Sequence, residues 1–186
     1  KFSSSKQTYL KREILWVFFI FCIYLTFVIP KLEDILTYDE LNWPLSAESF
    51  LKEGKAVSFL DRSADWSPQL YLNIQILIYK LLGVSNWSSR LIGLICVFFQ
   101  LFILFYIGKY LFQFSKERRL FFIVSSLFFI TNPAVIQGSL LPFSDTTLIS
   151  LFSVLFIFLF VKFEIKENWR VVILMILVLF FSFLLK

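Results

Sequence analysis

Three carboxylic acids in this sequence stand directly beside long apolar segments. Asp39 and Glu40 follow the first apolar segment as an adjacent pair. Asp145 lies 106 positions after Asp39, just before the apolar segment that begins at Thr147. A carboxylate beside apolar helices is costly to leave without a partner, and a raised pKa or a bound cation or metal accommodates it. These residues are therefore suited to taking a proton from a hydroxyl group or to holding a divalent metal.

Each of these acids also has an ordinary structural explanation. Asp145 is followed by Thr146 and Thr147, which makes it a good N-cap for the apolar helix behind it. Asp39 or Glu40 would equally suit a solvated loop near a helix N-terminus. The sequence leaves both explanations open beside the chemical one.

Four cations accompany the acids in the predicted outer part of the chain. Lys55, Arg62, Lys80 and Arg90 are candidates to meet a lipid phosphate. Their default role is to pack the side-chain stem on apolar surface while the charge lies among lipid headgroups.

Several kinds of site are excluded or disfavoured by residue content. The chain has no histidine, so a catalytic His base or a His-ligated zinc site within it is excluded. Cys22 and Cys96 lie inside apolar segments, where a thiol behaves as a small hydrophobic group. The net charge is +5, but the basic residues cluster at the ends of apolar segments. That distribution is typical of membrane orientation, and we expect no nucleic-acid partner.

The elements that must position these residues are helices in a membrane. Apolar residues make up 59% of the chain, which excludes a soluble domain. The phenylalanines occur in long runs without alternation, which favours helical spans over a β-barrel. We predict an all-α integral membrane protein, a single module from 1 to 186, with about five transmembrane helices. The predicted spans are 13–30, 90–112, 119–141, 146–163 and 170–186.

The first predicted connection, 31–89, is a long outer loop that contains two helices on the membrane surface, near 44–53 and 68–82. The second of these is about 15 residues long, roughly 22 Å of helix, which is too short to cross comfortably. Charge supports this choice, because a sixth crossing would place the basic cluster between 109 and 119 on the outer side. Between Lys31 and Trp66 the loop holds eight acidic and four basic residues, as expected for an outer face.

One predicted span contains a helix-breaking pair, Asn132-Pro133. Proline removes a backbone donor and disfavours helical conformation in the residue before it. We expect a bend at this point, which either shapes a cavity or simply bends a helix.

The order of four short motifs gives the chain a family resemblance. They are YDE at 38–40, SAESFLKEGK at 46–55, WSPQLY at 66–71 and LLGVSNWSSRL at 81–91. In this order the chain resembles the N-terminal part of the polyprenyl-phosphate-sugar-dependent glycosyltransferases of the GT-C fold. That group contains the protein O-mannosyltransferases and the lipid A aminoarabinose transferases. The resemblance extends from the first span to the span after Asp145.

The resemblance implies roles for the three acids. Asp39 is the candidate general base or a metal ligand, with Glu40 beside it, and Asp145 completes the acidic site. The implied cofactor is a divalent metal held by Asp39 and Asp145. The implied substrate is a polyprenyl-phosphate-linked sugar, transferred with inversion to a protein, lipid or glycan acceptor among membrane lipids. The implied location is a bacterial inner or plasma membrane, with a cytoplasmic N-terminus and an outward-facing active site.

The chain departs from the family pattern in two ways. Members often have a basic residue before a Pro-Pro-Leu run, whereas this chain has SPQL at 67–70. Phosphate binding then falls to Arg62, Arg90, Lys55, a metal or residues outside the chain. Relatives are also several hundred residues long, so we expect this chain to be part of an enzyme and inactive alone.

A noncatalytic membrane protein is the alternative hypothesis: a transporter or channel subunit, or a scaffold for envelope assembly. It explains the apolar spans without an acid pair, and the Asn132-Pro133 break favours it. Against it, the acids fall at the ends of predicted spans, whereas transporters place ionisable groups near the bilayer midplane.

Overall fold

The computed structural model describes residues 2–32, 34, 42–56, 69–141 and 145–185. Side chains are described from residue 14 onward within these ranges, except at 42, 43, 69, 145 and 146. Regular structure in the described ranges is entirely helical. The helices are α1 (Phe2–Val28), the 3-10 turn η1 (Ile29–Lys31), α2 (Asn42–Glu53), α3 (Gln69–Leu82), α4 (Asn86–Leu111), α5 (Ser115–Ile130), α6 (Pro133–Leu140), α7 (Asp145–Lys166) and α8 (Trp169–Phe183).

Among the described residues, three helices are long and apolar enough to cross a membrane. Their apolar segments are Ile14–Lys31, Asn86–Leu111 and Thr147–Lys166. The pair α5 and α6 counts as a fourth crossing if the two form one broken span, and α8 is apolar but shorter. The chain is therefore a helical protein with membrane-spanning character, as the composition predicts.

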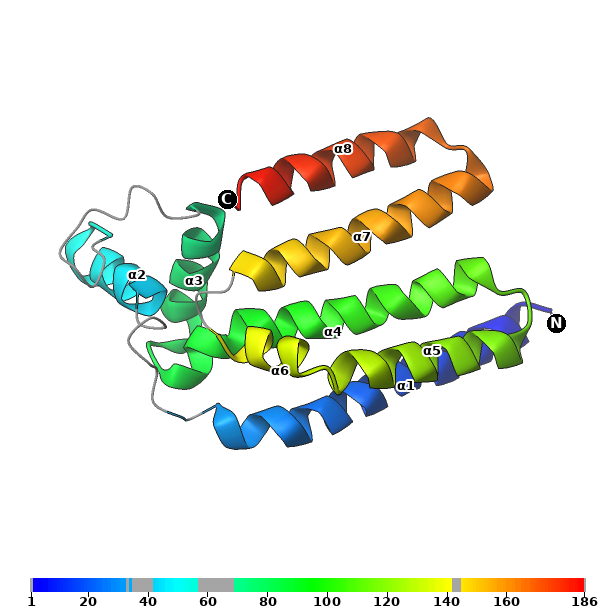
Figure 1. The fold of residues 1–186 in the computed structure, drawn as a ribbon, viewed down its shortest axis with the longest axis horizontal. Helices are drawn as coiled ribbons and strands as arrows, with labels where there is room; N and C mark the ends of the chain where they lie inside the picture. Colours follow the sequence, from blue (N-terminus) through cyan, green and yellow to red (C-terminus); the bar gives the residue numbers. More distant parts are fainter. Residues whose placement is uncertain (1, 33, 35–41, 57–68, 142–144, 186) are drawn as a thin grey trace.

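Long helices alternate in direction between two ends of the molecule (Figure 1). We name the end that holds α2 and α3 the cap end, and the end that holds the connections 112–114 and 167–168 the turn end. Helix α1 runs toward the cap end, α4 runs away from it, α5 and α6 return, α7 runs away and α8 returns (Figure 1). Helices α2 and α3, which lie between α1 and α4 in the sequence, are therefore both at the cap end.

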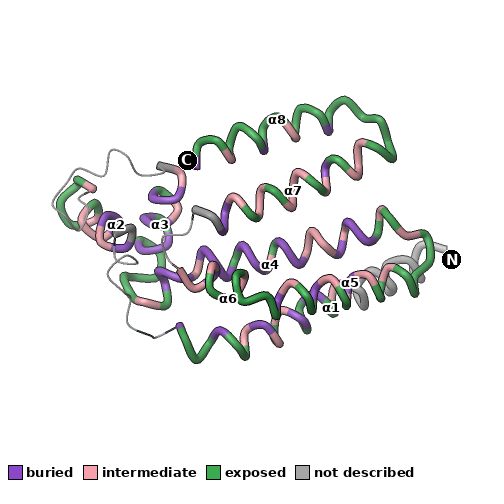
Figure 2. The backbone as a smooth tube through the Cα atoms, in the orientation of Figure 1, coloured by how far each residue is buried: buried purple, intermediate pink, exposed green. Residues whose placement is uncertain are grey.

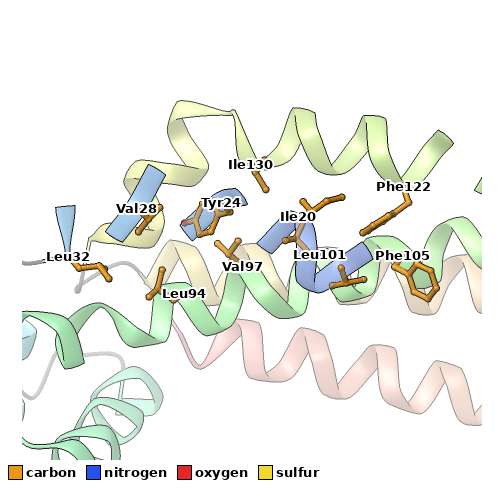
Figure 3. Packing of buried hydrophobic residues seen from close by; sticks show 11 residues of the cluster. Ile20, Tyr24, Val28, Leu32, Leu94, Val97, Leu101, Phe105, Phe122 and Ile130 are labelled. Carbon is orange, nitrogen blue, oxygen red and sulfur yellow. The ribbon is translucent and has the colours of Figure 1, made fainter. Parts of the chain in front are cut away.

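Helix α4 is the central element, and it packs against α1, α3, α5, α6 and α7. One core cluster joins it to α1, α5 and α6 through residues such as Ile20, Leu101 and Phe122 (Figure 3). A second cluster joins it to α2, α3 and α7 through residues that include Tyr71 and Cys96. Buried positions accordingly recur along the whole of α4, whereas α8 is mostly exposed (Figure 2).

Helix α3 is attached to the start of α4 by polar contacts between buried residues. The Tyr79 hydroxyl donates to Ser89 Oγ over 2.6 Å, and Ser89 Oγ in turn donates to the Ser85 carbonyl over 2.8 Å. Burial raises the pKa of Tyr79, so its hydroxyl remains a neutral donor. Ser85 also caps α4, because its side chain accepts from the Ser88 amide. The short α3 is thereby held against the first turn of α4.

The predicted bend at Asn132-Pro133 is confirmed. Helix α5 ends at Ile130, α6 begins at Pro133, and their axes differ by 61°. Asn132 Oδ1 accepts from the Ala134 amide over 2.9 Å, so Asn132 caps α6 while proline occupies its first position. The sequence pair thus ends one helix and starts the next in a new direction.

A glycine allows α6 to lie directly on α4. A Cβ atom at Gly93 would stand 2.0 Å from the Ser139 carbonyl oxygen and 2.9 Å from its Cα. Only a residue without a Cβ permits this approach of two backbones. Gly93 therefore sets the separation of α4 and α6.

We expect Gly93→Ala to destabilise the protein, by about 1–3 kcal/mol, because the methyl group meets backbone and not a movable side chain. The matched control is Gly138→Ala in α6, where an added Cβ meets nothing within 4 Å. Thermal unfolding in detergent checks both variants. An unchanged midpoint for Gly93→Ala would contradict the close approach.

Candidate functional site

A buried arginine at the cap end joins three separate parts of the chain. Arg90, in the second turn of α4, is only 4% exposed. Its Nε donates to the Leu140 carbonyl over 3.0 Å. Its Nη1 donates to the carbonyls of Lys31 and Leu32, each over 2.7 Å, and of Asp34 over 3.1 Å. We name this set of contacts the Arg90 clamp.

The clamp uses groups that helices leave without partners. The last carbonyls of a helix receive no hydrogen bond from within the helix, and they carry the negative end of the helix dipole. Lys31 ends η1 and Leu140 ends α6, so a guanidinium with several donors in a fixed plane suits both ends at once. The cation satisfies these carbonyls where α1 and α6 finish.

The clamp also fixes where the two acid-bearing segments begin. The segment that contains Asp39 and Glu40 starts directly after Asp34, and Asp39 is five positions beyond that clamped residue, at most roughly 17 Å of chain. Asp145 starts α7, five residues after the clamped Leu140. Both segments therefore leave the described structure from the same point at the cap end.

The predicted site residues differ in how far the structure describes them. Asp39, Glu40 and Arg62 lie outside the described residues. Asp145 is described as the first residue of α7 but its side chain is not. Lys55 is exposed just beyond the end of α2, where its carbonyl accepts from Ser49 Oγ over 3.0 Å.

Arg90, predicted as a phosphate-binding residue, is occupied in a different way. Two of its three guanidinium nitrogens donate to backbone carbonyls, so its described role is to position chain segments. A lone cation at the start of a long apolar helix looks the same in the sequence whether it meets a lipid, a phosphate or carbonyls. Only the tertiary contacts distinguish these roles.

Polar side chains line a cavity of about 290 Å³ between α4, α6 and α7. This volume is near the lower limit for small-molecule sites, about 300 Å³. Its polar lining comes from Gln100 on α4, Ser139 on α6, and Thr147 and Ser150 on α7. The remaining lining residues are Val97, Ala134, Val135 and Gly138. We name it the polar cavity.

Hydrogen bonds hold the lining of the polar cavity in place. Gln100 Nε2 donates to Ser150 Oγ over 2.8 Å, which ties α4 to α7. Thr147 Oγ1 donates to the Gly138 carbonyl over 2.9 Å, which ties α7 to α6. Ser139 Oγ donates to the Ile136 carbonyl over 2.8 Å and accepts from the Tyr24 hydroxyl of α1. Four helices therefore share one hydrogen-bonded arrangement.

None of the residues that line the polar cavity carries a charge. Amide and hydroxyl groups recognise hydroxyl-bearing ligands by exchanging hydrogen bonds, and the cavity walls also include apolar surface. Thr147 lies two residues after Asp145, so the carboxylate-bearing end of α7 begins within one helical turn of the cavity lining. An acid at a helix N-terminus is favoured by the helix dipole.

Sequence reasoning missed the polar cavity. The signal that could have found it is the occurrence of Gln100, Ser139, Thr147 and Ser150 within otherwise apolar segments. Gln100, Ser139 and the pair Thr147 and Ser150 belong to three different helices, so no local motif joins them. Packing of α4 against α6 and α7 brings them together.

An apolar groove of about 740 Å³ runs along α5 beside α4. It extends from Phe112 and Glu117 at the turn end to Asn132 at the bend, and its walls are mostly leucine, valine and phenylalanine. Ala134, which lines the polar cavity, lies two residues beyond Asn132. The groove therefore ends, and the lining of the polar cavity begins, at the bend between α5 and α6.

Within the described side chains, no group of three or more acidic or cysteine residues could hold a metal ion. The carboxylates predicted as metal ligands, Asp39 and Asp145, are not among those side chains.

We expect Arg90→Lys to lower stability by about 3 kcal/mol or more, because an ammonium cannot reach carbonyls of η1 and α6 together and buried carbonyls lose their partner. Arg170→Lys is the matched control, since Arg170 is exposed on α8. Thermal unfolding in detergent measures the loss. Equal midpoints for Arg90→Lys and the unchanged protein would contradict the clamp.

The chain was compared with protein families, curated proteins and solved structures. No family model, curated protein or solved structure matches the chain. The function must therefore be argued from the residues and the geometry above.

Proposed function

We propose that the chain is the membrane module of a glycosyltransferase that moves a sugar from a polyprenyl phosphate to a protein, lipid or glycan acceptor. The observation that carries the proposal is the polar cavity. It lies between apolar helices, is lined by hydroxyl and amide groups, and adjoins the end of α7 that bears Asp145. The Arg90 clamp supports it, because the segment bearing Asp39 and Glu40 starts at the same end.

The proposed membrane arrangement has five crossings: α1, α4, the broken pair α5 and α6, α7 and α8. Alternating helix directions support it, as do the basic residues near the turn end, among them Lys116, Arg119 and Arg170. In this arrangement the N-terminus and the turn end are cytoplasmic, in a bacterial inner or plasma membrane. Helices α2 and α3 lie on the outer surface, and the active site faces outward.

Transfer replaces one bond to the anomeric carbon by another. The bond from that carbon to the phosphate oxygen breaks with its electron pair, and the acceptor oxygen forms the new bond. Asp39 takes the acceptor proton as general base, with Glu40 beside it, while Asp145 provides the second carboxylate of the site. Attack from the face opposite the leaving phosphate gives inversion.

The leaving phosphate needs positive charge near it. Arg90 is engaged with carbonyls, so in this proposal Lys55 and Arg62 of the outer loop supply that charge. A divalent metal held by Asp39 and Asp145 would supply Lewis-acid stabilisation of the phosphate oxygens when bound. The apolar groove along α5 suits the polyprenyl tail, because its walls are apolar and it ends beside the bend at Asn132.

We expect Asp39→Asn in the intact enzyme to abolish sugar transfer while insertion and folding remain normal, because the amide cannot accept the proton. Glu53→Gln, at the exposed end of α2, is the control and should retain activity. Transfer from a synthetic polyprenyl-phosphate sugar, followed with membrane-purified enzyme, measures both. Normal turnover by a well-folded Asp39→Asn variant would remove Asp39 from the mechanism.

We expect Gln100→Leu to raise the KM for the donor by about tenfold, because the cavity loses an amide that can bond a sugar hydroxyl. Gln137→Leu is the control, since Gln137 is exposed on α6 and does not line the cavity. Initial rates over a range of donor concentrations separate KM from kcat. An unchanged KM in Gln100→Leu would disconnect the cavity from the donor.

The noncatalytic alternative has one observation in its favour, the 61° break between α5 and α6 beside the polar cavity. Broken helices form substrate sites in membrane carriers. The two variants above distinguish the hypotheses. A carrier of small polar solutes would lose uptake into vesicles with Gln100→Leu but keep it with Asp39→Asn.

A further inference from the structure

Toward the turn end, a second cavity opens between α1, α4 and α5. About 20 Å³ of it is open to a water-sized molecule, which is room for roughly one water, so a larger group can bind only at its mouth. Three of its lining residues are cationic and three are aromatic: Lys109, Arg118, Arg119, Trp16, Phe105 and Phe122. We name it the basic cavity.

The cations of the basic cavity have no carboxylate partner among the described residues. Among the described residues, the ion pair that forms is between Lys52 and Glu48 of α2, at the cap end. The nearest acid on the same helix, Glu117, lines the apolar groove on the other side of α5. Lys109 approaches the ring of Tyr106, with its Nζ 5.7 Å from the centroid, and no described carboxylate pairs with it.

Arg118 supplies a more specific sign of an anion. Its Nε is buried and has no hydrogen-bond partner within the described part of the chain. A buried donor without a partner costs roughly 1–3 kcal/mol, and such groups in native proteins call for a ligand or water. A guanidinium group binds phosphate through parallel N–H donors, so Arg118 beside two further cations suits a phosphate at the mouth of the cavity.

The surroundings of the basic cavity identify the source of that phosphate. Trp16 is 37% exposed, and tryptophan is the residue usual at a membrane–water interface. Leu15 and Leu120 are next to lining residues in the sequence and Phe19 lies one helical turn after Trp16, and all three are strongly exposed apolar side chains. Acyl chains can cover these side chains while the headgroup phosphate lies at the mouth of the cavity, which a free anion cannot do.

We propose that the mouth of the basic cavity binds the phosphate of an anionic phospholipid headgroup, with Arg118, Lys109 and Arg119 as the contacts. Basic cavities between membrane helices are suited to such headgroups. The bound lipid joins α1 to α4 and α5 at the end opposite the Arg90 clamp. This site is independent of the proposed sugar transfer.

Native mass spectrometry of the intact protein in uncharged detergent tests the proposal. The probes are phosphatidylglycerol, phosphatidylcholine and inorganic phosphate, each titrated against the unchanged protein and its variants. We expect one tightly bound phosphatidylglycerol, weakened about tenfold or more in Arg118→Gln. Lys116→Gln is the matched control, because Lys116 is exposed on the same helix end and does not line the cavity.

Each outcome decides the proposal. Retention of the lipid in Lys116→Gln and its loss in Arg118→Gln would support it. Equal loss in both variants would overturn it, since general surface charge would then explain binding. Equal binding of phosphatidylcholine, or displacement of the lipid by millimolar inorganic phosphate, would also overturn the headgroup assignment. If Arg118→Gln does not fold, Lys109→Gln, on the exposed end of α4, provides the same comparison.

Discussion

The fold at the cap end depends on one guanidinium group. Arg90 donates from two nitrogens to carbonyls of Lys31, Leu32, Asp34 and Leu140, which belong to two chain segments more than a hundred residues apart. Because helix ends in an apolar setting have no water to satisfy them, a buried cation is an efficient partner for several carbonyls. The clamp determines where the segments that carry Asp39, Glu40 and Asp145 begin.

Close packing around α4 complements the clamp. Gly93 lets the α6 backbone approach α4, and this approach brings Ser139 to the cavity that Gln100 and Thr147 also line. The bend after Ile130 is part of the same arrangement, since a straight continuation of α5 would not direct α6 across α4. A steric allowance at one glycine and a break at one proline therefore produce a polar space among apolar helices.

The two ends of the molecule have different chemistry. The cap end has a neutral polar cavity, and its predicted acids lie in the adjoining segments. The turn end has the basic cavity, where Lys109, Arg118 and Arg119 have no carboxylate partner among the described residues. A lipid anchored at the turn end would restrain α1, α4 and α5 there, while the Arg90 clamp restrains α1, α4 and α6 at the other end. The two restraints suit a scaffold that positions a site on one side of a membrane.

The sequence by itself determined the helical class, the membrane-spanning character and the bend at Asn132-Pro133, because hydropathy and proline geometry act locally. It also indicated helices at positions close to those of α2 and α3. It could not reveal the role of Arg90 or the polar cavity. Those depend on contacts such as Gln100 with Ser150 and Arg90 with Leu140, each spanning 50 residues. Local patterns carry no record of such distant pairings, so only the packing of the helices decided them.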